Sequence, residues 1–352
     1  MAGCGPWGGT RPMIKIGLVA PFEGLYRPLG YEVLSAVKLA LKERNEAGGV
    51  NGHMVELVAL NDGQEPAMAV QRAREMAVDP DIMGVIGHFD DETTLAALST
   101  YQQTGLALVV PLATATEITL RGYSQTFRLG ADNNLLGATA ARYAVVERGA
   151  RRLAVIRGWD DLVNSFIAAA REDEAVVVLD LEADEEGLLA ALAKERPDMV
   201  FFGGGALEGG ELLLQLQEAG LDIPLLGGNG LNSAYLVQVA QEAAGGTAYV
   251  TITPPLEDRG FIEGYAALSG GPPGPYAALA YDATHLLLNA VQEAITVQGK
   301  GTRQGVIAAL SQSEGYNGLT SLISFDDQGQ ALNPQVYIYE IVDGRYPGEL
   351  RR

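Results

Sequence analysis

Two segments of this sequence place hydroxyl and acidic side chains directly after apolar runs of strand length. In the first, from Gly87 to Thr94, a histidine, two aspartates, a glutamate and two threonines follow the run. In the second, from Pro111 to Thr116, threonines alternate with small apolar residues. Backbone N–H groups and threonine hydroxyls suit a carboxylate, and a helix N-terminus adds up to ~2 kcal/mol of favourable field. We therefore expect a carboxylate site here.

Catalytic chemistry is not indicated. The three histidines, His53, His88 and His285, lie far apart in sequence, and we expect His88 to be a hydrogen-bonded structural residue. There is no Walker loop, nucleophile elbow or His-Glu metal spacing. The carboxylate pairs Asp160-Asp161 and Asp326-Asp327 are interpreted as turns. We therefore predict a protein that is not an enzyme and has no metal or cofactor.

A glycine-rich stretch, Gly203 to Gly210, follows one strand and precedes a helix, as a dinucleotide-binding loop does. With Gly203 as the first glycine, the sixth position is Glu208, and other registers put Ala206 or Leu207 where glycine is needed. The stretch is therefore interpreted as a tight turn lining a cleft.

Composition excludes several partners. The 352 residues carry a formal net charge of -20, from 44 acidic against 24 basic residues. Nucleic-acid binding requires clustered Lys and Arg, whereas the basic residues here are dispersed. No apolar stretch approaches the roughly 20 residues that span a bilayer. Neither nucleic acid nor an anionic membrane is expected as a partner.

Apolar periodicity predicts regular alternation of strands and helices, which is the pattern of a parallel, doubly wound α/β sheet. In the first part, strands are expected at Ile14 to Leu18, Val55 to Leu60, Ile82 to Ile86 and Leu106 to Val110, with helices at Val33 to Arg44, Ala67 to Met76 and Thr94 to Thr104. The alternation restarts after about Ala131, so the chain holds two similar halves.

In the second half, strands are expected at Leu153 to Ile156, Val176 to Leu179, Met199 to Phe202 and Ile223 to Leu226, and helices at Leu135 to Arg148, Leu162 to Ala170, Glu186 to Lys194 and Glu211 to Ala219. After Thr253 the order changes to helices at Phe261 to Leu268, Tyr276 to Val297 and Val306 to Leu310, and strands at Leu322 to Phe325 and Val336 to Ile341. This C-terminal region has too few strands for a third domain. We expect it to complete two lobes that enclose a cleft.

The start of the sequence, Met1-Ala2-Gly3-Cys4, is typical of the end of a bacterial lipoprotein signal. Cys4 is the single cysteine, so no intramolecular disulfide is possible. Residues 1–12 are then expected to be a tether, with Cys4 lipidated outside the cytoplasm. The alternative, an accident of the start site, stays open because no charged or apolar signal region precedes the motif.

Three stretches, Ala47 to Gly52, Val85 to His88 and Pro111 to Thr126, carry a resemblance to a known family. Through them most of the chain, from about Ile14 to Tyr346, resembles the type I periplasmic binding proteins, specifically their leucine/isoleucine/valine-binding branch. The resemblance implies two Rossmann-like lobes, residues 13–131 with 256–325 and residues 132–255 with 326–352, joined by three hinge crossovers. It also implies a monomer that captures an amino acid or related small carboxylate by lobe closure and delivers it to the permease of an ABC importer.

The resemblance also implies a set of ligand contacts. Thr114 matches the family's second-loop threonine, whereas Asp91 stands where a Ser or Thr is usual and Asn229 where an acidic residue pairs with a ligand amine. The second lobe's aromatic positions fall near Leu162, with Trp159 as the nearest ring, and on Gly205. The candidates are Phe22, Tyr26, Arg27, Asp91, Glu92, Thr93, Leu112, Thr114, Trp159, Gly205 and Asn229.

These departures from the family's pattern leave the identity of the ligand open. Asp91 either takes over the amine pairing or caps the following helix. Arg27 either binds a carboxylate bidentately or remains a solvated loop residue or a partner of Glu23. Tyr26 and Trp159 either close over an apolar ligand body or pack against the hinge. A sensory domain of the same fold is the alternative function, although no helix-turn-helix or membrane-spanning segment accompanies it.

Overall fold

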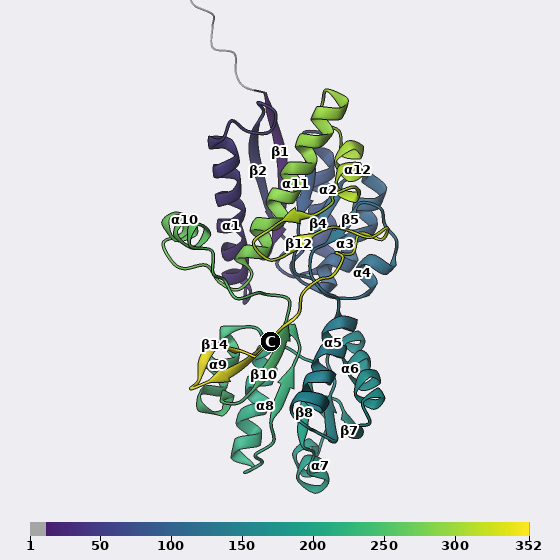
Figure 1. Cartoon of the computed structure of the whole chain (residues 1–352), viewed down its shortest axis with the longest axis vertical. Helices are drawn as coiled ribbons and strands as arrows, with labels where there is room; N and C mark the ends of the chain where they lie inside the picture. The colour runs from purple at the N-terminus through teal and green to yellow at the C-terminus, as the bar shows by residue number, and fades with distance from the viewer. Residues whose placement is uncertain (1–11, 352) are drawn as a thin grey trace, which may run out of the picture. The chain divides into compact units, whose positions relative to one another are not determined.

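The computed structural model describes residues 12–351, so the tether and Cys4 fall outside the described residues. The chain divides into two compact units. Unit 1 runs to Ala113 and contains Glu117–Gly130 and Leu256–Asn333. Unit 2 contains Thr114–Thr116, Ala131–Pro255 and the remainder from Pro334. Figure 1 colours the chain from purple at the N-terminus to yellow at the C-terminus, so that each unit contains segments of several colours.

The last boundary differs from the expected one at residue 325, because residues up to Asn333 pack with unit 1. Phe325 forms a bridge with Ala331, and Arg128 of unit 1 forms another with Gln330. The Arg128 Nε also donates to Gln330 Oε1 at 2.6 Å. Asp326 Oδ1 accepts from the backbone N–H groups of Gln328 and Gln330, which confirms the turn expected there.

Unit 1 is built on a five-stranded parallel sheet with the order β2-β1-β3-β4-β5. Its strands are β1 (Met13–Ala20), β2 (Met54–Asn61), β3 (Ile82–Ile86), β4 (Ala107–Val110) and β5 (Thr126–Arg128). Its helices are α1 (Arg27–Glu46), α2 (Pro66–Val78), α3 (Asp91–Thr104), α4 (Glu117–Leu120), α10 (Arg259–Ser269), α11 (Ala277–Gln298) and α12 (Arg303–Ser311). A two-stranded sheet, β11 (Tyr316–Asn317) with β12 (Leu322–Ile323), completes it.

Helices cover both faces of this sheet, as a strand that is buried throughout requires. Every residue of β3 is buried. Gly17 lies against Met76 of α2, whereas Gly84 lies against Leu287 of α11. The helices α2 and α3 pack together, as do α11 with α1 and α12 (Figure 1).

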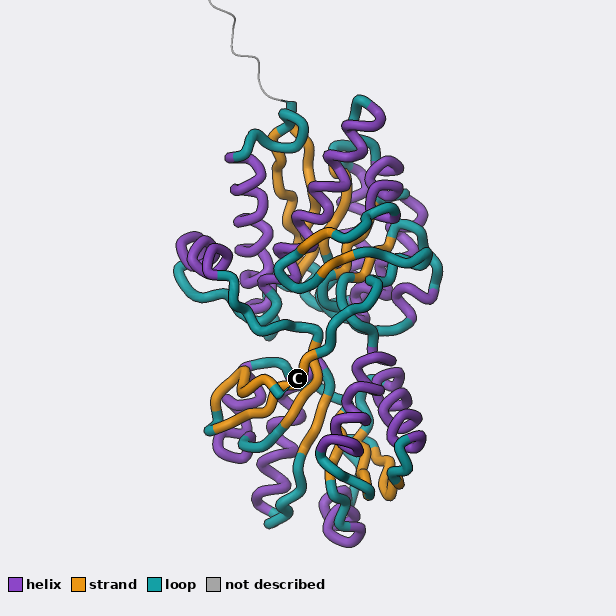
Figure 2. Tube along the Cα trace, in the orientation of Figure 1, coloured by secondary structure: helices purple, strands orange, loops and turns teal. Residues whose placement is uncertain are grey.

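Unit 2 has a seven-stranded sheet with the order β14-β13-β10-β9-β8-β6-β7. Its strands are β6 (Arg152–Ile156), β7 (Val176–Leu181), β8 (Met199–Phe202), β9 (Leu225–Gly227), β10 (Ala248–Thr251), β13 (Tyr337–Val342) and β14 (Arg345–Leu350). Its helices are α5 (Asn133–Arg142), α6 (Asp160–Glu172), α7 (Leu188–Glu195), α8 (Ala206–Glu218) and α9 (Ala234–Ala240), with shorter turns at η1 (Tyr143–Glu147), η2 (Asn229–Leu231) and η3 (Gln241–Ala244). The strand β13 is antiparallel to β10, and β14 is antiparallel to β13. Figure 2 draws the strands of this unit in orange and its helices in purple.

The central strand β8 shows how the layers of unit 2 are held. Successive side chains of a strand point to opposite faces. Phe201 stacks on Phe166 of α6 with ring centres 3.8 Å apart. Phe202 belongs to the core that α7, α8 and α9 share with the sheet. The apolar run predicted as a strand is therefore buried between two helical layers.

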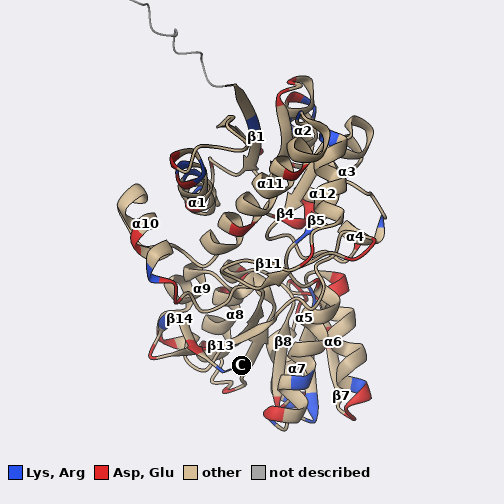
Figure 3. Ribbon diagram, turned by 45° about the horizontal axis from the view of Figure 1, so that its top comes forward, with Lys and Arg blue, Asp and Glu red and all other residues tan. Residues whose placement is uncertain are grey.

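Charged residues of both signs are interspersed along the helices of each unit (Figure 3). On α2, for example, Arg72 forms an ion pair with Glu75 at 2.7 Å. Within residues 12–351, no helix is long and apolar enough to cross a membrane.

One half-buried carboxylate links two helices of unit 1. Glu32 of α1 accepts a hydrogen bond from the backbone N–H of Tyr276, with 2.6 Å between Oε1 and the nitrogen, at the start of α11. Gly274 leaves room for this contact, because a Cβ there would lie 2.2 Å from Glu32 Oε2. Burial raises the pKa of Glu32 to about 7, although the N–H groups of Tyr276 and Ala277 act to lower it.

This carboxyl group should make unit 1 less stable as pH rises. Because its pKa is higher in the folded than in the unfolded chain, the stability it contributes is complete below an unfolded pKa of 4.5 and is lost as pH rises through about 7. Between about pH 5 and about pH 8 we expect a loss on the order of 1–2 kcal/mol, and Glu32→Gln should abolish it. Urea unfolding at both pH values tests this, with exposed Glu46→Gln as the control. An undiminished pH dependence in Glu32→Gln would contradict it.

Candidate functional site

The segment from the end of β1 to the first residue of α1 carries three candidates, Phe22, Tyr26 and Arg27. The backbone N–H of Phe22 donates to Asn61 Oδ1 at 2.7 Å, which ties the loop to the end of β2. The Phe22 ring meets Tyr31 edge-on at 5.9 Å, and the Arg27 guanidinium lies 5.1 Å from the same Tyr31 ring. Tyr26 is 45% exposed. Arg27 thus begins α1 with its charge over an aromatic ring instead of being a loop residue.

The loop between β3 and α3 shows that one alternative, in which Asp91 caps the following helix, is wrong. The N-cap of α3 is Asp90 and not Asp91, since Asp90 Oδ1 accepts from the backbone N–H of Thr93 at 2.9 Å. The Thr93 hydroxyl donates to the same carboxylate, and the Thr94 hydroxyl donates to the Asp90 carbonyl at 2.5 Å. Asp91 and Glu92 occupy the first turn of α3. The hydroxyl of Thr93 therefore makes its hydrogen bond within the N-cap of α3.

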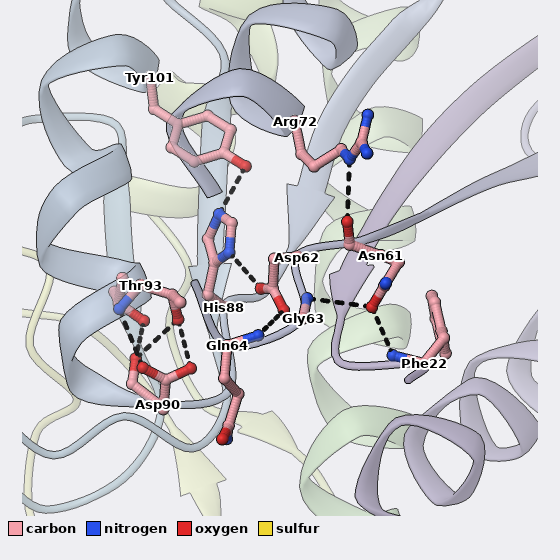
Figure 4. A network of polar contacts seen from close by, with 11 residues as sticks. Phe22, Asn61, Asp62, Gly63, Gln64, Arg72, His88, Asp90, Thr93 and Tyr101 are labelled. Carbon is pink, nitrogen blue, oxygen red and sulfur yellow. Dashed lines mark hydrogen bonds and ion pairs between the residues drawn. The ribbon is translucent and has the colours of Figure 1, made fainter. Parts of the chain in front are cut away.

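His88 of this loop belongs to a buried polar network, which is drawn in Figure 4. His88 Nδ1 lies 2.7 Å from Asp62 Oδ2, and His88 Nε2 lies 3.2 Å from the Tyr101 hydroxyl. All three side chains are fully buried. Burial raises the pKa of Tyr101, and burial is also the main reason that the pKa of Asp90 is raised. The expectation that His88 is a hydrogen-bonded structural residue is confirmed.

The Thr114 segment follows β4 of unit 1 but packs in unit 2. The Thr114 carbonyl accepts from the backbone N–H of Asn133 at 2.8 Å. Asp161 accepts from the Thr116 N–H at 2.9 Å and from Asn133 Nδ2 at 2.8 Å, using a different oxygen for each. Thr114 is 7% exposed, and Leu112, which belongs to unit 1, is 6% exposed. Asp161 therefore fixes the segment that carries Thr114.

Three further strand-end loops of unit 2 meet at one edge of its sheet. They follow β6, β8 and β9 and carry Trp159, Gly205 and Asn229 respectively. The Trp159 N–H donates to the Gly203 carbonyl at 3.0 Å. The Trp159 ring lies on Gly230, where a Cβ would stand 2.2 Å from the indole, and is 39% exposed. Gly205 is the N-cap of α8. This edge is a glycine-lined surface with an exposed aromatic ring.

Asn229 is part of a polar network that the sequence did not reveal. Thr251 Oγ1 donates to Asn229 Oδ1 at 2.6 Å, and Asn232 Nδ2 donates to the hydroxyls of Thr251 and Thr253 at 3.0 and 2.8 Å. The Thr-x-Thr pattern at the end of β10 was the available signal, since alternate residues of a strand share a face.

The geometry separates the candidates into two groups. Phe22, Tyr26, Arg27, Asp91, Glu92, Thr93 and Leu112 lie in unit 1, whereas Thr114, Trp159, Gly205 and Asn229 lie in unit 2. Both groups follow the carboxyl ends of parallel strands, where open α/β sheets bind ligands. Among residues 12–351 there is no group of three or more His, Cys, Asp and Glu that could hold a metal ion.

A family model for periplasmic binding proteins matches residues 13–345. The chain belongs to the periplasmic binding protein family. The leucine-, isoleucine-, valine-, threonine- and alanine-binding protein of Pseudomonas aeruginosa is 27% identical, over 97% of this chain and 93% of its own length. The Leu/Ile/Val-binding protein of Escherichia coli is 30% identical over 66% of each chain. The protein is thus a type I periplasmic binding protein of the leucine/isoleucine/valine-binding branch.

Solved structures agree with this assignment. An ABC transporter substrate-binding protein of Desulfitobacterium hafniense in complex with Leu has a TM-score of 0.83 and 26% identity, over 96% of this chain and 99% of that chain. A solute-binding protein of Rhodopseudomonas palustris in complex with benzoate has a TM-score of 0.79, over 95% and 94% of the two chains. At 20% identity, this second likeness shows the fold alone. The predicted fold class, two Rossmann-like α/β lobes, is confirmed.

Proposed function

We propose that this protein is the solute-binding component of an ABC importer, acts outside the cytoplasm and captures an amino acid or related small carboxylate. The family match from residue 13 to residue 345 supports the proposal most directly. The permease subunits of the importer are the proposed protein partners. We also propose that the protein is a monomer and carries a lipid anchor at Cys4. The anchor is tested by labelling with a radioactive fatty acid, and the label should be absent from Cys4→Ser.

The proposed mechanism is ligand-driven closure. The candidate loops of unit 1 and unit 2 both contact the ligand, so that the ligand favours the arrangement in which both contacts form. A shift from 1:99 to 99:1 requires ~5.5 kcal/mol of preferential binding. A few charge-assisted hydrogen bonds of ~1.5–3 kcal/mol each supply this.

We further propose that the ligand is released unchanged. Within residues 12–351, the pair of His88 with Asp62 beside the candidate loops is fully buried, so that its atoms are not exposed to a ligand. The candidate side chains of the two units offer hydroxyl, amide, carboxylate and guanidinium groups, which suit the binding of a small charged ligand. A ligand recovered after denaturation should therefore have the mass of the compound that was added.

Screening by thermal shift against amino acids, small organic acids and benzoates, together with native mass spectrometry of the purified protein, tests the function. At least one carboxylate should raise the melting temperature and bind one per chain. Failure of every compound to bind, with no co-purified molecule, would contradict the proposed function.

A further inference from the structure

The orientation of the Asn229 amide is set by the network behind it. Thr251 Oγ1 has one hydrogen and two lone pairs, and its neighbours determine how they are used. Asn232 Nδ2 lies 3.0 Å away, the Thr253 N–H 3.2 Å and the Thr253 hydroxyl 3.0 Å. Tyr346 donates its hydroxyl to Asn232 Oδ1 at 2.8 Å, which points the Asn232 amide nitrogen at the threonines.

Two donors, Asn232 Nδ2 and the Thr253 N–H, already fill the two lone pairs of Thr251 Oγ1. If the Asn229 amide were rotated, its Nδ2 would be a further donor beside Asn232 Nδ2 and the Thr253 N–H. The Thr251 hydrogen would also exchange its acceptor Asn229 Oδ1, at 2.6 Å, for the Thr253 hydroxyl at 3.0 Å. The oxygen of Asn229 therefore faces Thr251, and the NH₂ group points away from the network.

The outward NH₂ group is available to a ligand. Asn229 is half-buried, and its Nδ2 makes no hydrogen bond to any described residue of the protein. The adjacent residue, Gly230, lies under the Trp159 ring. The indole N–H is a second donor that cannot accept. This rim of unit 2 thus presents donors beside an apolar ring.

We propose that Asn229 is a specificity-determining residue, which makes unit 2 bind an anionic acceptor such as a ligand carboxylate and exclude an ammonium group. The inference rests on the proposed function, because it concerns the same ligand. A carboxylate accepts from both donors, and hydrogen bonds to a charged partner are the stronger ones. An ammonium has only donors, so it would face two donors without a partner, which is how a site rejects the wrong group.

An acidic side chain lies at the same edge and provides the competing explanation. Glu208, in the first turn of α8, is exposed and has a carboxylate oxygen 2.9 Å from where a Cβ of Gly205 would be. If Glu208 paired with a ligand amine, unit 2 would select an ammonium group despite Asn229. The proposal therefore requires Glu208 to serve only the N-terminus of α8, where an acidic residue is favourable.

The experiment is calorimetric titration of the full chain with leucine, 4-methyl-2-oxopentanoate, benzoate and the strongest binder from the thermal-shift screen. Asn229→Asp keeps an acceptor for Thr251 but puts negative charge at the rim, and Asn229→Leu removes the donor. Both should weaken the binding of 4-methyl-2-oxopentanoate and benzoate, which carry a carboxylate and no ammonium group, about tenfold or more. The control Asn164→Asp, which adds the same charge at an exposed position of α6, should bind like the wild type. Glu208→Gln should also leave the affinities unchanged.

Two results would overturn the inference alone. One is wild-type affinity in both Asn229 variants, and the other is loss of leucine binding in Glu208→Gln. A wild type that binds no compound of the panel or the screen would instead overturn the proposed function, and the inference would fail with it. Melting temperatures of the variants, measured without ligand, show that each is folded when it is titrated.

Discussion

Replacing Thr114 with alanine should weaken ligand binding by about 10- to 100-fold and leave folding almost unchanged. The proposal gives Thr114 a charge-assisted hydrogen bond to the ligand carboxylate, worth ~1.5–3 kcal/mol. The backbone of the segment is held by the hydrogen bond from Asn133 to the Thr114 carbonyl and by Asp161.

The same segment supplies a matched control. Thr116 is two residues away and 8% exposed, and its hydroxyl is buried without a partner among the described residues. Thr116→Ala should therefore keep the affinity and leave stability equal or slightly higher, because no hydrogen bond is lost. Calorimetric titration of both variants with the strongest binder checks the prediction. Equal ligand affinities for the two variants would show that Thr114 does not contact the ligand.

Replacing His88 with leucine should lower the free energy of unfolding by about 3–5 kcal/mol, because it leaves the buried Oδ2 atom of Asp62 without its hydrogen-bond partner. Asp62 is fully buried and lies 2.7 Å from His88 Nδ1. The Tyr101 hydroxyl would lose the contact with His88 Nε2 as well. Since His88 directly precedes Phe89 and the Asp90 cap, the start of α3 should also loosen.

Urea unfolding followed by far-UV circular dichroism measures this loss, and hydrogen exchange of the α3 amides measures the local effect. His53→Leu is the control, because His53 is half-buried and makes one 3.3 Å contact, between Nδ1 and the Asn51 carbonyl. Its stability should stay within about 1 kcal/mol of the wild type. A His88→Leu protein as stable as His53→Leu would contradict the structural role of the network.

The strands were the most predictable elements. The bounds expected for β3 and β8 are those observed, because each is a short apolar run between turn residues and is buried on both faces. The strand β10 was missed, since its four residues lie between Gly246 and Pro254 and show no clear alternation. Its place in the sheet comes from pairing with β9 and β13, which one segment of sequence does not show.

The helix α8 began earlier than predicted, at Ala206 instead of Glu211. Gly209 and Gly210 were interpreted as part of a turn because glycine disfavours helix. In the structure they lie inside the helix, where a Cβ would stand 2.7 Å from Leu231 and from Val239 respectively. Tertiary packing here outweighs intrinsic propensity.

The positions of the candidate loops could be predicted, because these loops follow strand ends. The hydrogen bonds that hold the loops in place could not be predicted. Asp161 was interpreted only as part of a turn, yet it joins the Thr114 segment to α5 and α6. Both partners lie far from it in sequence. The direction of the Asn229 amide likewise depends on Thr251 and Asn232. Residue types predict what a site can bind, whereas the orientation of each group depends on contacts from elsewhere in the chain.

The central claim is that one ligand engages both units. Spin labels at two exposed positions, Arg74→Cys on α2 and Gln215→Cys on α8, in a Cys4→Ser background, report the distance between the units by pulsed electron spin resonance. We predict that the strongest binder from the screen shifts the distance distribution, with one population growing in proportion to occupancy, and that Thr114→Ala requires more ligand for the same shift. Identical distributions with and without saturating ligand would contradict the account.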